Sequence, residues 1–129
     1  MVETLRLSKE EAARIVESLN YRHEEGTVVA VVQDNHSLEV LMVASVNREA
    51  LFKTLTTGLL HFWSLSRHSL WLKGETSGNY QLLVDFKVDC DADAVLFKVE
   101  PKGPACHTMN RSCFYRGYGE LTADRSSKH

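Results

Sequence analysis

All three cysteines of the chain and a group of three aspartates lie within residues 89–113. The aspartates alternate with other residues, as Asp89, Asp91 and Asp93. In an extended segment alternate side chains face one way, so we expect three carboxylates on one side of roughly 13 Å of chain. Carboxylates this close repel one another unless a cation lies among them, and such oxygen ligands suit Mg²⁺ or Ca²⁺. The segment is therefore a candidate site for a hard metal ion.

The thiols indicate a softer metal. Cys90 faces away from the aspartates in the same extended segment, and Cys106 and Cys113 follow later in the chain. Three sulfur ligands suit zinc. A structural zinc ion normally takes four protein ligands, whereas three leave a position for a water molecule that the metal activates. The set therefore predicts a catalytic zinc site.

Both groups are also compatible with simpler roles. Most free cysteines are small buried hydrophobic residues, and a disulfide with one thiol left over is also compatible with three cysteines. The aspartates are compatible with a solvated turn. They also match the first ligand positions of an EF-hand calcium loop, with Glu100 at its last position. Ala94 stands where that loop needs a glycine, and strand-forming residues follow it. Calcium sensing is therefore disfavoured.

Composition limits the class of protein and its partners. The 129 residues form one domain, and 43% hydrophobic and 25% charged residues are typical of a soluble globular protein. A net charge of −2 gives no electrostatic basis for nucleic-acid binding. No segment has the length of a membrane span, and the N-terminus lacks the apolar region of a signal peptide. We expect a cytoplasmic protein with a small ligand, whose thiols stay reduced and are available for metal binding or catalysis.

The periodicity predicts an α+β fold. Ser8 and Glu11 form a capping box at the start of one helix, and Asn47 caps a second helix that ends before Gly58. Alternating and β-branched segments predict six strands, at residues 27–33, 39–44, 59–64, 70–73, 80–89 and 94–99. We expect a mostly antiparallel sheet, with an open, barrel-like core and two short helices.

Two segments between these strands could bind a ligand. Trp63 and Trp71 are core residues by default, but either offers a stacking surface for a purine if it faces a cleft. Residues 73–79 are rich in glycine and hydroxyl groups, so their backbone N–H groups and Lys73 could surround an anion. Their order is not that of a P-loop, and an ordinary hairpin loop is equally compatible.

Seven short strings, in this order and spacing, resemble the phosphoribosyl-AMP cyclohydrolase family of histidine biosynthesis. They cover residues 31–34, 47–51, 61–64 with 66–67, 70–71, 73–79, 89–94, and 105–108 with 112–114. The resemblance extends over residues 26–116, which we expect to form the catalytic domain. Residues 1–25 would then be an N-terminal helical segment and residues 117–129 a polar tail.

The resemblance implies a hydrolase whose substrate is 1-(5-phosphoribosyl)-AMP and whose reaction opens the adenine ring between N1 and C6. It implies zinc held by Cys90, Cys106 and Cys113, and magnesium held by Asp89, Asp91 and Asp93. It also implies an intertwined homodimer in which the zinc ligands come from both subunits. Cys90 therefore need not meet the other two thiols within one chain.

The expected mechanism uses zinc to lower the pKa of its bound water, so that hydroxide attacks C6. His107 is the candidate general base or proton shuttle, because an imidazole titrates near the working pH. Its alternative role is a hydrogen bond that only orients the zinc site. Magnesium could neutralise a substrate phosphate. The candidate substrate-binding residues are Trp63, Arg67, Trp71, Lys73, Thr76 and Ser77.

Three residues depart from the family's usual pattern. Leu65 stands where an arginine is common, Met109 where a glycine usually follows the threonine, and Ser45 where an aromatic residue is frequent. Leu65 removes one possible phosphate contact, and Met109 could alter the loop between two thiols. The main alternative function is a structural zinc module that binds a protein partner.

Overall fold

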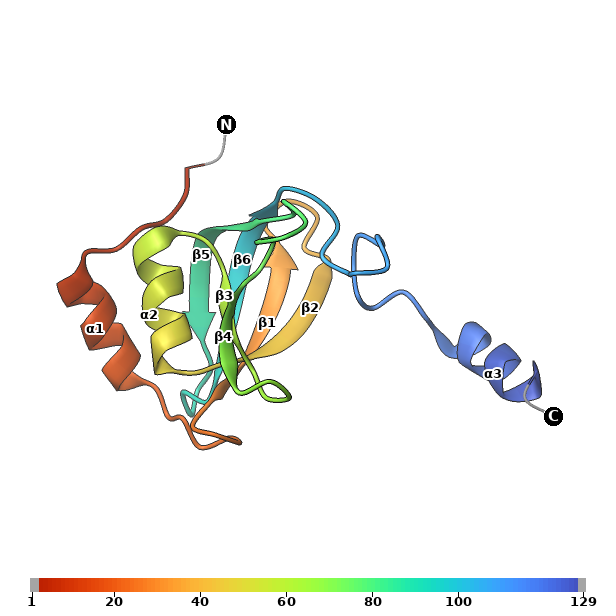
Figure 1. The fold of residues 1–129 in the computed structure, drawn as a ribbon, viewed down its shortest axis with the longest axis horizontal. Helices are drawn as coiled ribbons and strands as arrows, with labels where there is room; N and C mark the ends of the chain where they lie inside the picture. The colour runs from red at the N-terminus through yellow and green to blue at the C-terminus, as the bar shows by residue number, and fades with distance from the viewer. Residues whose placement is uncertain (1–2, 128–129) are drawn as a thin grey trace.

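The computed structural model describes residues 3–127 and has the α+β class that the sequence predicts (Figure 1). Its elements in chain order are α1 (Lys9–Ser18), β1 (Val28–Asp34), β2 (Val40–Val46), α2 (Arg48–Thr57), β3 (His61–Ser64), β4 (Ser69–Leu72), β5 (Gln81–Val88), β6 (Ala94–Pro101) and α3 (Tyr118–Ser127).

The strands form two sheets. The larger has the order β2-β1-β6-β5, and the smaller is the β3–β4 hairpin. β1 is antiparallel to β2 and β5 is antiparallel to β6, as expected, but β1 is parallel to β6, so the larger sheet is mixed. Because β1 and β6 start at the same edge, the chain before β1 lies beside the turn before β6, as the hydrogen bond from the Asn20 N–H to the Ala92 carbonyl shows (2.7 Å).

The core lies between the larger sheet and a layer made of α2 and the β3–β4 hairpin, with α1 packed on α2 (Figure 1). Val28, Ala30 and Val32 alternate along β1 and are fully buried. Phe62 of β3 and Phe97 of β6 are also fully buried in the same core. Burying a side chain such as Val or Phe contributes about 1.5–3 kcal/mol. This packing fixes β3 and β4, which carry both tryptophans.

The predicted helix boundaries are confirmed. The Ser8 hydroxyl accepts the Glu11 N–H (3.2 Å) before α1, and the Asn47 side chain accepts the Ala50 N–H (2.9 Å) before α2. Gly58 ends α2 in the left-handed conformation (φ 77°), and its N–H donates to the Thr54 carbonyl. A residue other than glycine is strained in this conformation. These caps set the direction in which the chain enters β3.

The prediction of two helices is incomplete, because residues expected as a polar tail form α3. In Figure 1 this helix projects away from the sheets. Its first turns offer only Tyr118 and Leu121 as large apolar side chains, both exposed, so the sequence carries no amphipathic periodicity there. Residues 1–2 of the N-terminal segment and 128–129 of the tail lie outside the described residues.

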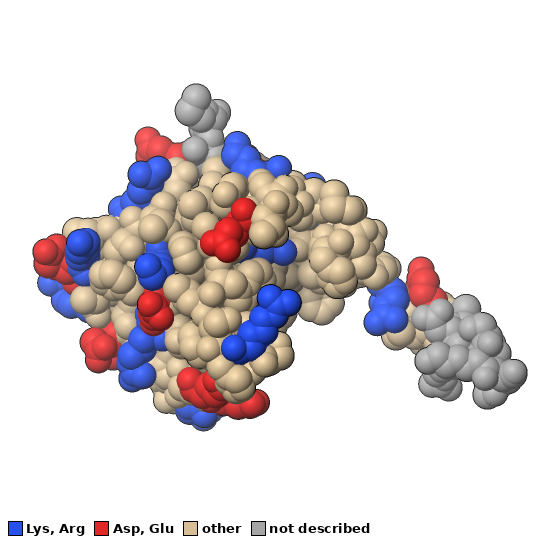
Figure 2. All heavy atoms as spheres, in the orientation of Figure 1, with Lys and Arg blue, Asp and Glu red and all other residues tan. Residues whose placement is uncertain are grey.

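The surface agrees with the near-neutral composition. Basic and acidic side chains are interspersed over the face drawn in Figure 2, and neither sign forms a continuous patch there. Within residues 3–127, none of the helices has the length and apolar character needed to cross a membrane.

Candidate active site

A cleft of about 930 Å³ opens between the β3–β4 hairpin, the loop of residues 73–79 and the segment after β6. It gathers all six residues that the sequence suggested as substrate-binding, which come from the hairpin and from the loop. Lining this cleft are Trp63, Arg67, Trp71, Lys73, Thr76 and Ser77, together with Cys106 and His107. A set of aromatic, cationic and hydroxyl groups beside a thiol and an imidazole can bind an aromatic anion and transfer protons at its ring.

Both tryptophans line the cleft and are half-buried. The Trp71 ring packs on Phe62, with centroids 5.1 Å apart, and the Lys73 ammonium lies 5.8 Å from the Trp71 centroid. The Trp63 indole N–H donates to Glu25 Oε1 (3.2 Å). His68 pairs with the same carboxylate (2.8 Å), and these hydrogen bonds from His68 and Trp63 lower the pKa of Glu25. Each indole is thus oriented by its own contacts.

The loop of residues 73–79 presents its side chains, rather than its backbone N–H groups, to the cleft. The N–H groups of Glu75 and Gly78 donate to carbonyls inside the loop and its approach, so they do not point at a ligand as the sequence suggested. Lys73 Nζ donates to the carbonyl of Ala105 (2.5 Å). This bond joins the loop to the segment that carries Cys106, and leaves the Lys73 charge at the cleft wall.

Cys106 and Cys113 are neighbours, close enough for each thiol to shift the pKa of the other. Hydrogen bonding to Thr108, whose hydroxyl lies 2.9 Å from the Cys106 sulfur, lowers the pKa of Cys106. The neighbouring Lys73 ammonium acts in the same direction. Burial and the adjacent Cys106 raise the pKa of Cys113. One thiol of the pair therefore ionises more readily, as a soft metal ligand must.

Cys90 does not join this pair within one chain. It lies in the turn between β5 and β6, whereas Cys106 and Cys113 follow the opposite end of β6 (Figure 1). At about 3.3 Å per residue, the strand between them spans roughly 23 Å. All three thiols are free, so the disulfide alternative is not realised in this structure. A single chain thus brings two thiols together and leaves the third distant.

The aspartates cluster, but not in the way that the sequence suggested. Residues 89–93, the aspartate turn, reverse the chain instead of extending β5, and Ala92 takes the left-handed conformation (φ 63°). Asp89 Oδ1 accepts the N–H groups of Asp93 and Ala94 (3.1 Å each), which closes the turn. Oxygen atoms of Asp89, Asp91 and Asp93 all lie within 4.8 Å of one another. This arrangement fits a hard divalent cation.

Two residues before β1 bind the same carboxylates. Arg22 donates to Asp93 (2.7 Å) and Asp91 (3.1 Å), and His23 Nε2 lies 3.2 Å from Asp93. Hydrogen bonding to Asp91 and Arg22 lowers the pKa of Asp93 to about 2, while the adjacent Asp93 and Asp89 raise the pKa of Asp91. The aspartate turn does not line the cleft of this chain. Glu100 lies near the far end of β6, so no EF-hand loop forms.

Sequence reasoning missed two residues near the thiols, Asp34 and Arg111. Arg111 forms an ion pair with Asp34, across 77 positions of sequence. The available signal was the position of Arg111 between two cysteines, but nothing in the sequence indicates its partner.

The departures from the family pattern, Ser45, Leu65 and Met109, all line the cleft. Met109 has φ 72°, a conformation that favours the glycine usual there.

Comparison with known proteins assigns the family. The family model described as phosphoribosyl-AMP cyclohydrolase matches residues 42–115, which include both walls of the cleft, the aspartate turn and all three cysteines. The chain belongs to the phosphoribosyl-AMP cyclohydrolase family.

Individual relatives of this family extend the similarity towards the N-terminus. The phosphoribosyl-AMP cyclohydrolase of Sulfurisphaera tokodaii is 60% identical over 117 residues, which are 91% of this chain and 99% of that protein. The protein of the same name from Saccharolobus solfataricus is 72% identical over 85 residues, 66% of this chain and 100% of the relative. That from Methanothermobacter thermautotrophicus is 59% identical over 101 residues, 76% and 73% of the two chains. The sequence resemblance to this family is thereby confirmed.

Proposed function

We propose that this protein is a phosphoribosyl-AMP cyclohydrolase, which hydrolyses the bond between N1 and C6 of the adenine ring of 1-(5-phosphoribosyl)-AMP in histidine biosynthesis. The observation that carries the proposal is the cleft, in which Trp63, Trp71 and Lys73 meet Cys106 and His107. Its volume of about 930 Å³ suits a ligand of nucleotide size. The names of the family and of its relatives agree with this activity.

Substrate binding follows from the cleft walls. Arg67 and Lys73 provide the positive charges for the two phosphates of the substrate, and Thr76 and Ser77 provide hydroxyl groups. Trp63 and Trp71 provide indole faces for the base. Fixing the ribose phosphates on these side chains would hold the adenine ring beside Cys106 and His107, which line the same cleft.

We propose that zinc binds Cys106 and Cys113 of one subunit and Cys90 of a second subunit. The support is the geometry of a single chain, which pairs two thiols at the cleft and leaves the third, exposed, at the other end of β6. An exposed thiol at a distant turn is available to another copy. A bound zinc ion supplies Lewis-acid activation of water when three ligands leave one position open. The proposal therefore requires a homodimer.

His107 follows Cys106 directly, is exposed and lines the cleft. In the proposed reaction, written for the neutral 6-imino form of the ring, the oxygen of water bonds to C6 and the C6–N1 bond breaks. One water proton ends on the exocyclic nitrogen of C6, which becomes a carboxamide, and the other ends on N1. His107 is the proposed group that takes this proton and returns it, since a neutral imidazole accepts and donates near neutral pH. Lys73, hydrogen-bonded to the Ala105 carbonyl, holds this segment beside the loop of residues 73–79.

Magnesium is the proposed ligand of the aspartate turn, because three carboxylates within 4.8 Å of one another suit an oxygen-seeking divalent cation. The Arg22 guanidinium pairs with Asp91 and Asp93 in this structure, and His23 Nε2 lies 3.2 Å from Asp93. Magnesium would therefore compete with Arg22 for Asp93. A cation held there in a dimer could neutralise a substrate phosphate.

The test of the proposed function is turnover. Purified protein supplied with zinc and magnesium should convert 1-(5-phosphoribosyl)-AMP to its ring-opened product, followed by the change in ultraviolet absorbance. Cys106→Ser should abolish the reaction while the fold, measured by circular dichroism, is kept. Folded protein that binds zinc but has no turnover would contradict the proposal and favour the structural zinc module.

A further inference from the structure

The segment that carries two of the thiols, residues 105–113, is a closed loop, named here the thiol loop. The Ala105 N–H donates to the Arg111 carbonyl (3.1 Å), and the Cys106 N–H donates to the Asn110 carbonyl (3.2 Å). The Met109 N–H donates to the Cys106 carbonyl (3.0 Å). The position of Arg111 thus fixes the start of the loop as well as its end.

The end of the thiol loop is attached to β2. The Cys113 N–H donates to the Leu41 carbonyl (2.7 Å), and the Ser112 hydroxyl donates to the Val40 carbonyl (2.7 Å). β2 is an edge strand of the larger sheet, so its outer backbone groups are open to such bonds. These contacts hold Cys113 but do not reach Cys106.

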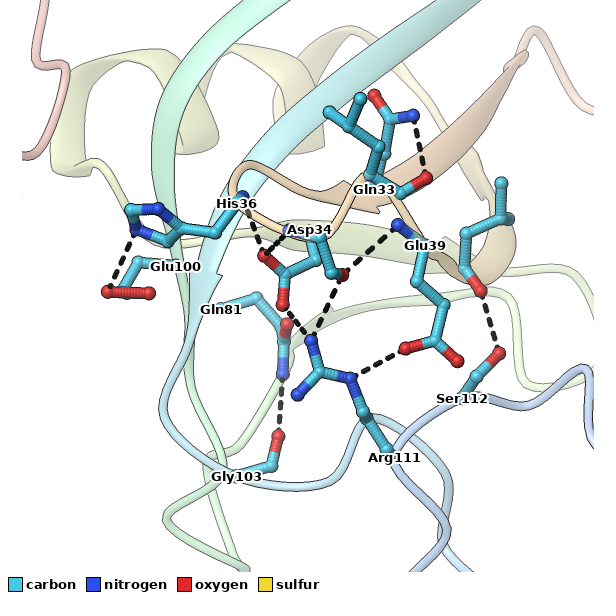
Figure 3. A network of polar contacts seen from close by, with 12 residues as sticks. Gln33, Asp34, His36, Glu39, Gln81, Glu100, Gly103, Arg111 and Ser112 are labelled. Atoms are coloured by element: carbon cyan, nitrogen blue, oxygen red, sulfur yellow. Dashed lines mark hydrogen bonds and ion pairs between the residues drawn. The ribbon is translucent and has the colours of Figure 1, made fainter.

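Arg111 attaches the thiol loop to the β1–β2 hairpin through three side chains (Figure 3). Its guanidinium donates to Asp34 and to Glu39 Oε1 (2.6 Å), and also to the Ser37 hydroxyl (3.1 Å). The Asp34 side chain is 5% exposed, whereas those of Arg111 and Glu39 are 55% and 43% exposed. The buried carboxylate is therefore the fixed partner, and Glu39 is a more solvated one.

The Asp34 carboxylate is oriented by its own hairpin, independently of Arg111. Its Oδ1 accepts the N–H groups of His36 (2.7 Å) and Ser37 (3.2 Å), which leaves Oδ2 for the guanidinium. Burial alone would raise the pKa of Asp34, but these two bonds and the Arg111 charge outweigh it, and the pKa lies below its ordinary value. A carboxylate fixed by its own backbone gives Arg111 one defined position.

We propose that Asp34 and Arg111 are positioning residues for the zinc site, which hold Cys106 and Cys113 at the separation that one metal ion requires. The inference rests on the proposed function, in which these thiols are zinc ligands. Neither residue touches the sulfur atoms. Arg111 acts through its carbonyl, which accepts the Ala105 N–H at the start of the thiol loop, and through its place two residues before Cys113; Asp34 acts through Arg111.

Asp34→Asn is the variant that tests this role. The amide keeps the volume of the carboxylate and an acceptor for the two backbone N–H groups, but it turns a donor towards the guanidinium. Residues that orient metal ligands typically change metal affinity by about 10–100-fold when they are replaced. We expect zinc to bind at least about tenfold more weakly to Asp34→Asn, measured by competition with a chelator.

A second measurement does not depend on zinc. In metal-free protein, Asp34→Asn should increase the hydrogen exchange rate of the Cys106 and Cys113 amides, and the rate at which Cys106 reacts with a thiol reagent. Arg111→Lys keeps the charge, but a lysine ammonium cannot reach both carboxylates at once. This variant should therefore also show faster amide exchange and faster thiol reaction than wild type. Glu39→Gln removes the solvated partner and should give a smaller change of the same kind.

Two controls separate positioning from loss of stability. Glu100→Gln removes the carboxylate that lies 3.7 Å from His36 Nε2 in the hairpin, a contact outside the thiol loop. Val16→Ala weakens the core at α1, a helix that packs on α2 and not on the thiol loop. Both should keep wild-type zinc affinity and wild-type amide exchange in the thiol loop. If Asp34→Asn folds poorly, Glu39→Gln and Arg111→Lys supply the same comparison.

The two ways of failing are distinct. If wild-type protein binds no zinc, the proposed function fails, while amide exchange and thiol reactivity still test the positioning role. If Asp34→Asn and Arg111→Lys lower the melting temperature but leave zinc affinity, amide exchange and thiol reactivity as in Val16→Ala, the pair is only structural and the inference is wrong.

Discussion

Gly74→Ala tests whether the shape of the loop of residues 73–79 determines activity. Gly74 has φ 92°, and an added Cβ would lie 2.6 Å from the Tyr80 nitrogen and 2.7 Å from the Asn79 carbonyl carbon. Left-handed backbone costs a residue with a Cβ roughly 1–2 kcal/mol. Overlap with packed atoms typically costs about 1–3 kcal/mol more. We therefore expect Gly74→Ala to lose about 2–5 kcal/mol of unfolding free energy, measured by urea denaturation.

The displaced backbone lies directly after Lys73, which lines the cleft and contacts the Ala105 carbonyl. A shift of about 1 Å in a group that positions substrate can cost on the order of 100-fold in rate. We expect kcat/KM for the cyclohydrolase reaction to fall by about that factor in Gly74→Ala.

Gly78→Ala is the matched control in the same loop. Gly78 has φ 80°, but an added Cβ would meet no atom within 4 Å. It should therefore lose only the backbone contribution, about 1–2 kcal/mol, and keep most of its activity. Equal losses of stability and activity in the two variants would refute the argument, because the close approach to Tyr80 would then have no consequence.

Three further predictions follow from single residues. His107→Ala should lower kcat by about a hundredfold or more if the imidazole transfers a proton, with zinc content unchanged by elemental analysis; loss of zinc instead would show that His107 only orients the site. The folded pKa of Asp34 lies below its ordinary value of 3.8, so ionised Asp34 stabilises the fold above about pH 4 and this contribution disappears as pH falls through the folded value. Denaturation from about pH 6 to about pH 3 should show a steeper loss of stability in wild type than in Asp34→Asn, and parallel profiles would contradict this. Met109→Gly relieves a positive φ of 72° at an exposed position and should raise the melting temperature, since the relief of about 1–2 kcal/mol exceeds the added chain entropy of about 0.4–1 kcal/mol; a lower melting temperature would contradict it.

Local features of the fold could be predicted because their causes lie within a few residues. Ser8 and Asn47 begin helices and Gly58 ends one, each through a hydrogen bond to a residue at most four positions away. The six strands are also present, although β1 and β6 pair in parallel. Strand order depends on contacts between distant segments, so periodicity along the chain could not reveal it.

The candidate site shows the same division between local and distant contacts. Asp89, Asp91 and Asp93 are neighbours in sequence, and they cluster even though the segment is a turn and not the expected strand. The contacts of Arg22 with Asp93 and of Asp34 with Arg111 span 71 and 77 positions, and no local pattern indicates them. The proposed third zinc ligand lies in another chain, which no pattern within one sequence can locate.

The central claim, that one active site takes thiols from two subunits, is tested most directly by mixing two inactive variants. Cys90→Ser and Cys106→Ser should each be inactive alone. When equal amounts are unfolded and refolded together, half of the dimers are mixed and each holds one complete set of thiols, so about a quarter of the wild-type activity should return. No recovery from the mixture, or full activity in Cys90→Ser alone, would contradict this claim.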